Sequence, residues 1–167
     1  MEKNYSVLMS VYNKEKPDNL NLSVASVLNQ TIPPEQFVIV CDGFLGDELN
    51  NVLARFTEQY PKLFWIEQLQ ENKGLGVALN IGLKLCHNDI VARMDSDDIS
   101  RPDRCERQFR IIERDGYDLV SGTLQEFSKK PGDMDRLTLG ATIFPLSSAA
   151  TFSISIREEL VQEPMQT

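Results

Sequence analysis

Three carboxylates follow directly after a short apolar run in the middle of the chain. Asp95, Asp97 and Asp98, with Ser96 among them, come after residues 90–94 (IVARM). A short apolar run bounded by polar residues predicts a buried strand, so these acids would leave the sheet at the strand end, where α/β proteins bind ligands. A divalent cation that prefers oxygen ligands would relieve their mutual repulsion, and Mg²⁺ or Mn²⁺ accepts both carboxylate and phosphate oxygens. The pattern therefore indicates a metal-diphosphate site.

The same acids could also serve a turn, a calcium loop or a phosphatase. Asp is common in turns, and a D-x-D taken alone is more often structural or solvated. An EF-hand loop counted from Asp95 would end at Glu106, but Ile99 and Ser100 stand where that loop needs a ligand and a glycine. A phosphatase of the haloacid dehalogenase type normally carries its D-x-D after the first strand, whereas three strand candidates precede this one. The metal-diphosphate site is the interpretation carried forward.

Length, charge and cysteine content limit the classes of protein to which this chain could belong. A chain of 167 residues fits one domain with a real core. Its net charge of −8, without a basic block, argues against a nucleic acid partner or an anionic membrane surface. No apolar run approaches the length of a bilayer and no signal-peptide pattern opens the sequence, so we expect a cytoplasmic location. Three widely spaced cysteines and a single histidine predict reduced core thiols rather than a zinc site, the residues being Cys41, Cys86, Cys105 and His87.

Strand and helix patterns alternate along the first part of the chain. Apolar runs predict strands at residues 5–11, 37–41, 64–66, 90–94 and 119–121. Helical spacing predicts the elements between them, at residues 18–30, 49–60, 75–86 and after residue 100. This alternation predicts a mostly parallel α/β sheet flanked by helices, with right-handed crossovers. Beyond residue 128 the pattern fails, leaving a loop at 128–133 and a strand or two, one of them near 152–156.

Details of these helices concern how they start and pack. We expect Asp18 to cap the first helix, and Ser100 with Asp103 to form a capping box with Pro102 in the first turn of the last one. The small residues Ala78 and Gly82 would let the third helix pack close to the sheet. Polar residues fall at three strand ends, which would line one rim of the sheet.

Several motifs, taken in this order, resemble the inverting glycosyltransferases of family 2, which have the Rossmann-like GT-A fold. The matching residues are 7–13 (VLMSVYN), 38–43 (VIVCDG), 72–74 (NKG) with Ala78 and Asn80, 94–98 (MDSDD) and 101–104 (RPDR). The resemblance covers roughly the first three-quarters of the chain. It implies a GT-A nucleotide-sugar-binding domain at residues 1–127 and an atypical, shortened tail at residues 128–167.

The resemblance also implies an activity. The enzyme would move a sugar from a nucleotide-sugar donor, a UDP-sugar by preference, to a glycan or lipid-linked glycan acceptor, with inversion and with Mn²⁺ or Mg²⁺. Its role would be the synthesis of a bacterial-type polysaccharide or surface glycan. The resemblance leaves open a peripheral association with the inner face of the membrane and a homodimer.

Carried over by position, the resemblance assigns roles to individual residues. Tyr12 would stack near the base and Asp42 would accept a hydrogen bond from it, which suits uracil. Asp95 would lie by the ribose and the metal, and Asp97 would be the principal metal ligand. The rest of the donor wall would comprise Val11, Asn13, Asn72, Lys73, Gly74, Asn80 and Ser96.

A purely structural role is also open to several of these residues. Tyr12 could simply cover a strand end, and Asp42 before a glycine could only form a turn. Lys73 could reach a phosphate, but a lysine is most often a solvated charge. Arg101 and Arg104 could form modest ion pairs with the nearby acids.

The general base of an inverting transfer is the residue that the sequence does not assign. Such a base deprotonates the acceptor hydroxyl, and in the family it comes from an acidic pair in a later segment. After residue 128 the only adjacent acidic pair is Glu158 and Glu159, in a charged amphipathic context typical of a solvated helix, and Asp133 and Asp135 match less well. Three hypotheses follow, namely a working transferase, a donor-binding domain with little or no transfer activity, and a nucleotide-sensing or scaffold module.

Overall fold

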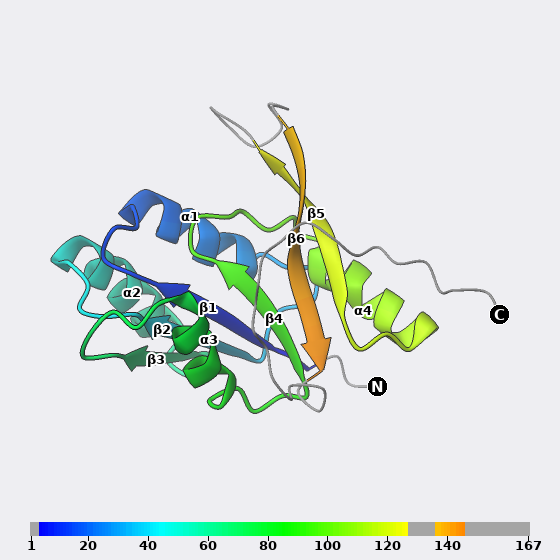
Figure 1. Cartoon of the computed structure of the whole chain (residues 1–167), viewed down its shortest axis with the longest axis horizontal. Helices are drawn as coiled ribbons and strands as arrows, with labels where there is room; N and C mark the ends of the chain where they lie inside the picture. The colour runs from blue at the N-terminus through cyan, green and yellow to red at the C-terminus, as the bar shows by residue number, and fades with distance from the viewer. Residues whose placement is uncertain (1–3, 127–135, 146–167) are drawn as a thin grey trace.

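The computed structural model describes residues 4–126 and 136–145 of the chain. The strands are β1 (Ser6–Val11), β2 (Gln36–Cys41), β3 (Phe64–Gln68), β4 (Ile90–Asp95), β5 (Val120–Glu126) and β6 (Arg136–Pro145). The helices are α1 (Pro17–Leu28), α2 (Asp47–Gln59), α3 (Leu75–Leu83) and α4 (Arg104–Asp115). The described strands form one sheet in the order β3-β2-β1-β4-β6-β5 (Figure 1). Strands β3, β2, β1 and β4 run parallel and β6 runs antiparallel to both β4 and β5, so the prediction of a mostly parallel α/β sheet is confirmed.

Strand β6 comes from the part of the chain whose sequence pattern gave no sustained period. It enters the sheet between β4 and β5 although β5 precedes it in the chain (Figure 1). It overlaps the segment in which a strand or two were expected. The expected loop at 128–133 and the expected strand near 152–156 lie outside the described residues.

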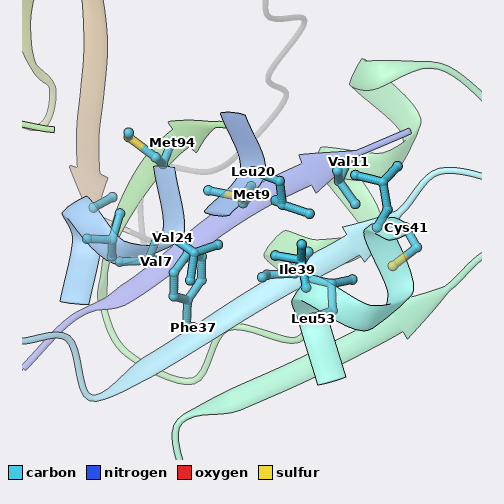
Figure 2. Close-up of a cluster of buried hydrophobic side chains, with 14 of the residues drawn as sticks. Val7, Met9, Val11, Leu20, Val24, Phe37, Ile39, Cys41, Leu53 and Met94 are labelled. Atoms are coloured by element: carbon cyan, nitrogen blue, oxygen red, sulfur yellow. The ribbon is translucent and has the colours of Figure 1, made fainter. Parts of the chain in front are cut away.

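The core lies on both faces of the sheet because the strands are buried on both sides. Alternate residues of β1 and β2 face α1 and α2 on one side of the sheet (Figure 2). Helix α4 contributes to the same side, and α3 covers the other. The larger cluster includes Val7, Met9, Val11, Leu20, Val24, Phe37, Ile39, Leu53 and Phe109, and the smaller one Leu8, Val38, Val40, Ala78 and Leu79. This two-sided burial explains the continuous apolar runs of the central strands. All three cysteines are buried and free, as predicted.

Helix α3 approaches the sheet closely through Gly82. A Cβ atom added there would overlap the Leu8 side chain and would lie 2.8 Å from Val40 Cγ2. The expectation that a small residue permits close packing is therefore confirmed at this position. The helix ends at Leu83, three residues earlier than predicted.

Two predicted helix starts are wrong. Helix α1 begins at Pro17 rather than after an Asp18 cap, because proline fits the first helical position, where no N–H is needed, and Asp18 lies in the first turn. The capping box before α4 does not form. Asp103 pairs instead with Arg101 and Arg107, and its side chain makes no cap hydrogen bond.

A line of polar side chains along α1 binds the segment that follows β4. Ser23 Oγ donates to the carbonyl of Asp95 at 2.8 Å, and Ser26 Oγ accepts from the backbone N–H of Ser100 at 2.9 Å. Gln30, just beyond the helix, donates to the Arg101 carbonyl at 2.7 Å and to the Ser100 hydroxyl at 3.0 Å. Positions 23, 26 and 30 share one helix face, so α1 fixes the path of the chain from the end of β4 to the start of α4. No helix in the described part of the chain has the length and apolar character needed to cross a membrane.

Replacing Gly82 by alanine tests the close approach of α3. We expect Gly82→Ala to lower the free energy of unfolding by about 1–3 kcal/mol, because the added methyl overlaps packed side chains. The matched control is Gly76→Ala in the same helix, where an added Cβ meets nothing within 4 Å. That variant should gain about 0.5–1 kcal/mol from helix propensity. Urea denaturation followed by circular dichroism measures both, and equal stabilities would contradict the packing argument.

Replacing Gln30 tests the polar line on α1. Gln30 is buried, and Gln30→Ala would leave the Arg101 carbonyl and the Cys105 N–H, which donates to Gln30 Oε1 at 3.1 Å, without this partner. We expect a loss of about 2–3 kcal/mol in the free energy of unfolding, since buried polar groups left unpaired are costly. The exposed Gln59→Ala serves as control. A loss no larger than that of the control would show that α1 does not hold this segment.

Candidate functional site

The carboxyl ends of three neighbouring strands meet at one edge of the sheet. Strand β1 pairs in parallel with β2, with Val11 opposite Cys41, and with β4, with Ser10 opposite Asp95. Tyr12, Asp42 and residues 95–98, which we call the acidic motif, therefore share one rim although they are far apart in the sequence. The predicted convergence of polar groups at strand ends is observed.

Asp42 is 4% exposed and joins this rim to the loop before α3. Its Oδ1 accepts from the backbone N–H of Lys73 at 2.7 Å, and its Oδ2 accepts from that of Gly74 at 2.9 Å. The Asn72 side chain donates to the Asp42 carbonyl at 3.2 Å. A carboxylate has about four acceptor sites, so two backbone donors leave capacity for a ligand.

The glycine after Asp42 allows this contact. Gly43 has a φ of +88°, and a Cβ there would lie 2.8 Å from the backbone nitrogen of Asn72. A side chain at position 43 would therefore be strained and would push the two loops apart. The Asp42-Gly43 pair and the loop at 72–74 form one packed unit.

At the end of β1 the side chains point in different directions. Tyr12 is 43% exposed and Asn13 is exposed, so both are available to a ligand. The Val11 side chain lies in the core, so only its backbone faces the rim, and its carbonyl accepts from the Asp42 N–H at 2.7 Å. A hollow of about 370 Å³ lies beside this strand end, lined by Asn13, Glu15, Pro17, Gly46, Asp47, Glu48 and Leu49.

The acidic motif combines paired and unpaired carboxylates. The Arg93 guanidinium forms an ion pair with Asp95. Burial raises the pKa of Asp95, an effect that Arg93 opposes and Asp97 increases. Burial, together with the charges of Asp95 and Asp97, also raises the pKa of Asp98 to about 6. The predicted repulsion among these acids is thus present.

This donor set fits a hard divalent cation that is completed by a ligand. Asp97 is exposed, and its carboxylate makes no hydrogen bond or ion pair with the residues that the structure describes. Within the same residues, no three His, Cys, Asp or Glu side chains gather as a metal cage. Mg²⁺ is commonly held by one or two carboxylates plus substrate phosphates, so Asp97 with Asp95 would suffice only when a diphosphate is present.

The side chains of Lys73 and Asn80 take no part in these contacts. Lys73 contributes its backbone, while its ammonium lies 4.0 Å from the exposed Glu71. Asn80 is exposed on α3, nearly two turns beyond Gly74. The candidate bases lie outside the described residues, namely Glu158, Glu159, Asp133 and Asp135.

The arginines after the acidic motif do not pair with it directly. Arg101 forms an exposed ion pair with Asp103 at 3.2 Å. The Arg104 guanidinium lies 3.4 Å from the carbonyl of Arg93, although its charge still lowers the pKa of Asp98 slightly against the other effects. The modest ion pair with a nearby acid is therefore observed for Arg101, whose partner is Asp103, whereas Arg104 forms no such pair with the residues that the structure describes.

Sequence reasoning missed two residues of this rim. Arg93 sits inside the apolar run of β4, where an arginine preceding acids by two positions was a usable signal of a strand-end ion pair. Glu15 contacts the hydroxyl of Ser96 at 2.7 Å across 81 residues of sequence, and no local pattern reports such a contact.

Known proteins resemble this chain in sequence. The sequence model described as "Glycosyl transferase family 2" matches residues 6–161. The amylovoran biosynthesis glycosyltransferase AmsE of Erwinia amylovora is 42% identical over 118 residues, which are 71% of this chain and 44% of that protein. An Escherichia coli protein named UDP-Gal:alpha-D-GlcNAc-diphosphoundecaprenol beta-1,3-galactosyltransferase is 36% identical over 132 residues, 77% of this chain and 46% of that one. The chain thus spans less than half the length of these relatives.

Solved structures share the fold. The mannosyltransferase PcManGT of Pyrobaculum calidifontis, in complex with GDP-Man and Mn²⁺, matches 73% of this chain and 35% of its own with a TM-score of 0.64 and 19% identity. TarS residues 1–349 of S. aureus match 86% of this chain and 47% of their own with a TM-score of 0.64 and 21% identity. These likenesses show a GT-A fold. The family match over residues 6–161 shows that the chain belongs to glycosyl transferase family 2.

Proposed function

We propose that this chain forms the donor side of a metal-dependent glycosyltransferase that takes a sugar from a UDP-sugar and passes it, with inversion, to a glycan or lipid-linked glycan acceptor. The product would be a bacterial-type polysaccharide or surface glycan. The observation that carries the proposal is the convergence of Tyr12, Asp42 and the acidic motif at the ends of adjacent parallel strands. The UDP-Gal in the name of the Escherichia coli relative supports the choice of donor.

The rim offers a separate contact for each part of such a donor. The exposed Tyr12 ring supplies a stacking face, and the remaining acceptor capacity of Asp42 suits an imide N–H of uracil. Asp97, with Asp95, would hold Mn²⁺ or Mg²⁺, which when bound neutralises charge on the diphosphate leaving group. The rim would thus recognise the base with Tyr12 and Asp42, and its carboxylates would hold the cation that binds the diphosphate.

The acceptor half of the reaction needs a base that the donor rim does not supply. In an inverting transfer, the acceptor hydroxyl attacks the anomeric carbon as a base removes its proton and the nucleoside diphosphate leaves. Glu158 and Glu159 stay the candidates for that base. The diphosphoundecaprenol in the name of one relative supports a lipid-linked acceptor and thus action at the inner face of the membrane.

A second candidate function is donor binding with little or no transfer. The chain spans less than half the length of the relatives that it matches. The resemblance to the family implies that much of the acceptor wall comes from a later segment. Titration with UDP, with and without Mn²⁺, together with an assay for hydrolysis of UDP-glucose and UDP-galactose, separates the two. Metal-dependent binding with hydrolysis supports a working transferase, and binding without hydrolysis favours the donor-binding domain. No binding in either condition would overturn both.

Replacing Asp97 tests the metal assignment. We expect Asp97→Ala to abolish the gain in UDP affinity that Mn²⁺ gives, because the free carboxylate at the rim is lost, while metal-free affinity stays unchanged. Isothermal titration calorimetry at fixed ionic strength measures both affinities.

The matched control is Asp89→Ala, which removes the same charge from an exposed position just before the other end of β4. Position 89 lies about 20–25 Å from the acidic rim, at about 3.3 Å per strand residue, so its removal should not alter the metal effect. If Mn²⁺ raises the UDP affinity of the Asp97→Ala variant as much as that of the unmodified protein, the assignment of Asp97 as a metal ligand is wrong.

A further inference from the structure

One carboxylate in the described part of the chain connects the two halves of the rim and is not used by the proposed function. Glu15 lies between β1 and α1, and its Oε2 accepts the hydroxyl hydrogen of Ser96 at 2.7 Å. Its Oε1 accepts from the backbone N–H of Lys16 at 2.7 Å and from the Asn19 amide at 3.2 Å. One side chain therefore joins the loop after β1, the first turn of α1 and the middle of the acidic motif.

The hydrogen bond between Ser96 and Glu15 lies between two acids of the acidic motif. Ser96 is 6% exposed and lies between Asp95 and Asp97. On one side, the Asp95 carbonyl is held by Ser23 and its carboxylate pairs with Arg93. On the other, the Asp97 side chain contacts no described residue by hydrogen bond or ion pair. The direction of the Asp97 carboxylate therefore depends on its backbone, which continues from Ser96, the residue whose hydroxyl contacts Glu15.

Glu15 lies at the N-terminus of α1, whose N-cap Lys16 makes no side-chain cap hydrogen bond, so the helix dipole favours a negative charge at this position. The Glu15 N–H also donates to the Tyr12 carbonyl at 3.0 Å, which ties the same residue to the base side of the rim.

We propose that Glu15 is a positioning residue that holds the acidic motif at a fixed place relative to Tyr12, so that the base and the diphosphate of one donor are bound together. The proposal rests on the proposed function. It assigns Glu15 no contact with the donor or the metal and places its effect in the Ser96 hydrogen bond.

The test compares Glu15→Ala, Ser96→Ala, the double variant and Glu15→Gln by calorimetry with UDP and Mn²⁺. We expect each alanine variant to lose about tenfold or more in metal-dependent affinity, because a hydrogen bond to a charged group is removed. The double variant should bind no more weakly than either single variant, since both remove one interaction. Glu15→Gln should retain most of the affinity, because its amide can still accept from Lys16 N–H and donate to Ser96.

The control for charge and helix position is Asp18→Ala, an exposed acid in the first turn of α1. The affinity of this variant for UDP with Mn²⁺ should equal that of the unmodified protein. Additive losses in the double variant, or an affinity of Glu15→Ala equal to that of Asp18→Ala, would overturn the proposal. So would a loss in Glu15→Gln as large as that in Glu15→Ala.

A second measurement separates this proposal from the proposed function. The NMR order parameters of the amides of residues 95–98, taken without ligand, should fall in Glu15→Ala and not in Asp18→Ala. If the unmodified protein binds no UDP with metal, the proposed function fails, and unchanged order parameters in Glu15→Ala would overturn the positioning role independently.

Discussion

The parallel pairing of β1 with both β2 and β4 is the constraint on which the site depends. It places Val11 beside Cys41 and Ser10 beside Asp95, so the residues that follow emerge along one edge. In a strand buried on both faces, a shift of one residue would move every apolar side chain to the opposite face. The core therefore fixes the register, and the register fixes the rim. The same buried side chains that stabilise the fold decide which polar groups meet.

Polar groups at the rim are held by contacts that replace water. Asp42 is nearly inaccessible, yet both of its carboxylate oxygens accept backbone N–H groups from the loop before α3. A buried carboxylate with such partners retains favourable interactions for its charge. Asp42 therefore shapes the loop before α3, and the proposed contact with a donor base would use its remaining acceptor capacity.

The acidic motif differs from Asp42 in how its negative charges are compensated. Burial and mutual repulsion raise the pKa of Asp95 and Asp98, and among the described residues only Arg93 forms a direct ion pair with the motif. The segment keeps its path because α1 binds it from behind through Ser23 and neighbouring polar side chains. Helix α1 therefore has two roles, with apolar residues facing the core and polar residues holding a segment that electrostatics alone would push apart.

The sequence by itself determined the alternation of strands and helices, the buried runs of β1, β2 and β4, and the acids at the end of β4. These follow from local periodicity and composition, which depend on neighbouring residues only. The predictions from sequence that were wrong also concerned local structure. Pro17 starts α1 where Asp18 was expected to cap it, and Asp103 pairs with arginines instead of closing a capping box.

Only the tertiary structure decided which distant groups meet. The placement of β6 between β4 and β5, the capture of the 72–74 loop by Asp42 and the contact of Glu15 with Ser96 join residues that are far apart in the chain. Such pairings depend on strand order and on packing against a shared core, and no periodicity in the sequence encodes them. The sequence alone therefore indicates which residue types form the candidate site, whereas the tertiary fold determines which of these residues contact one another.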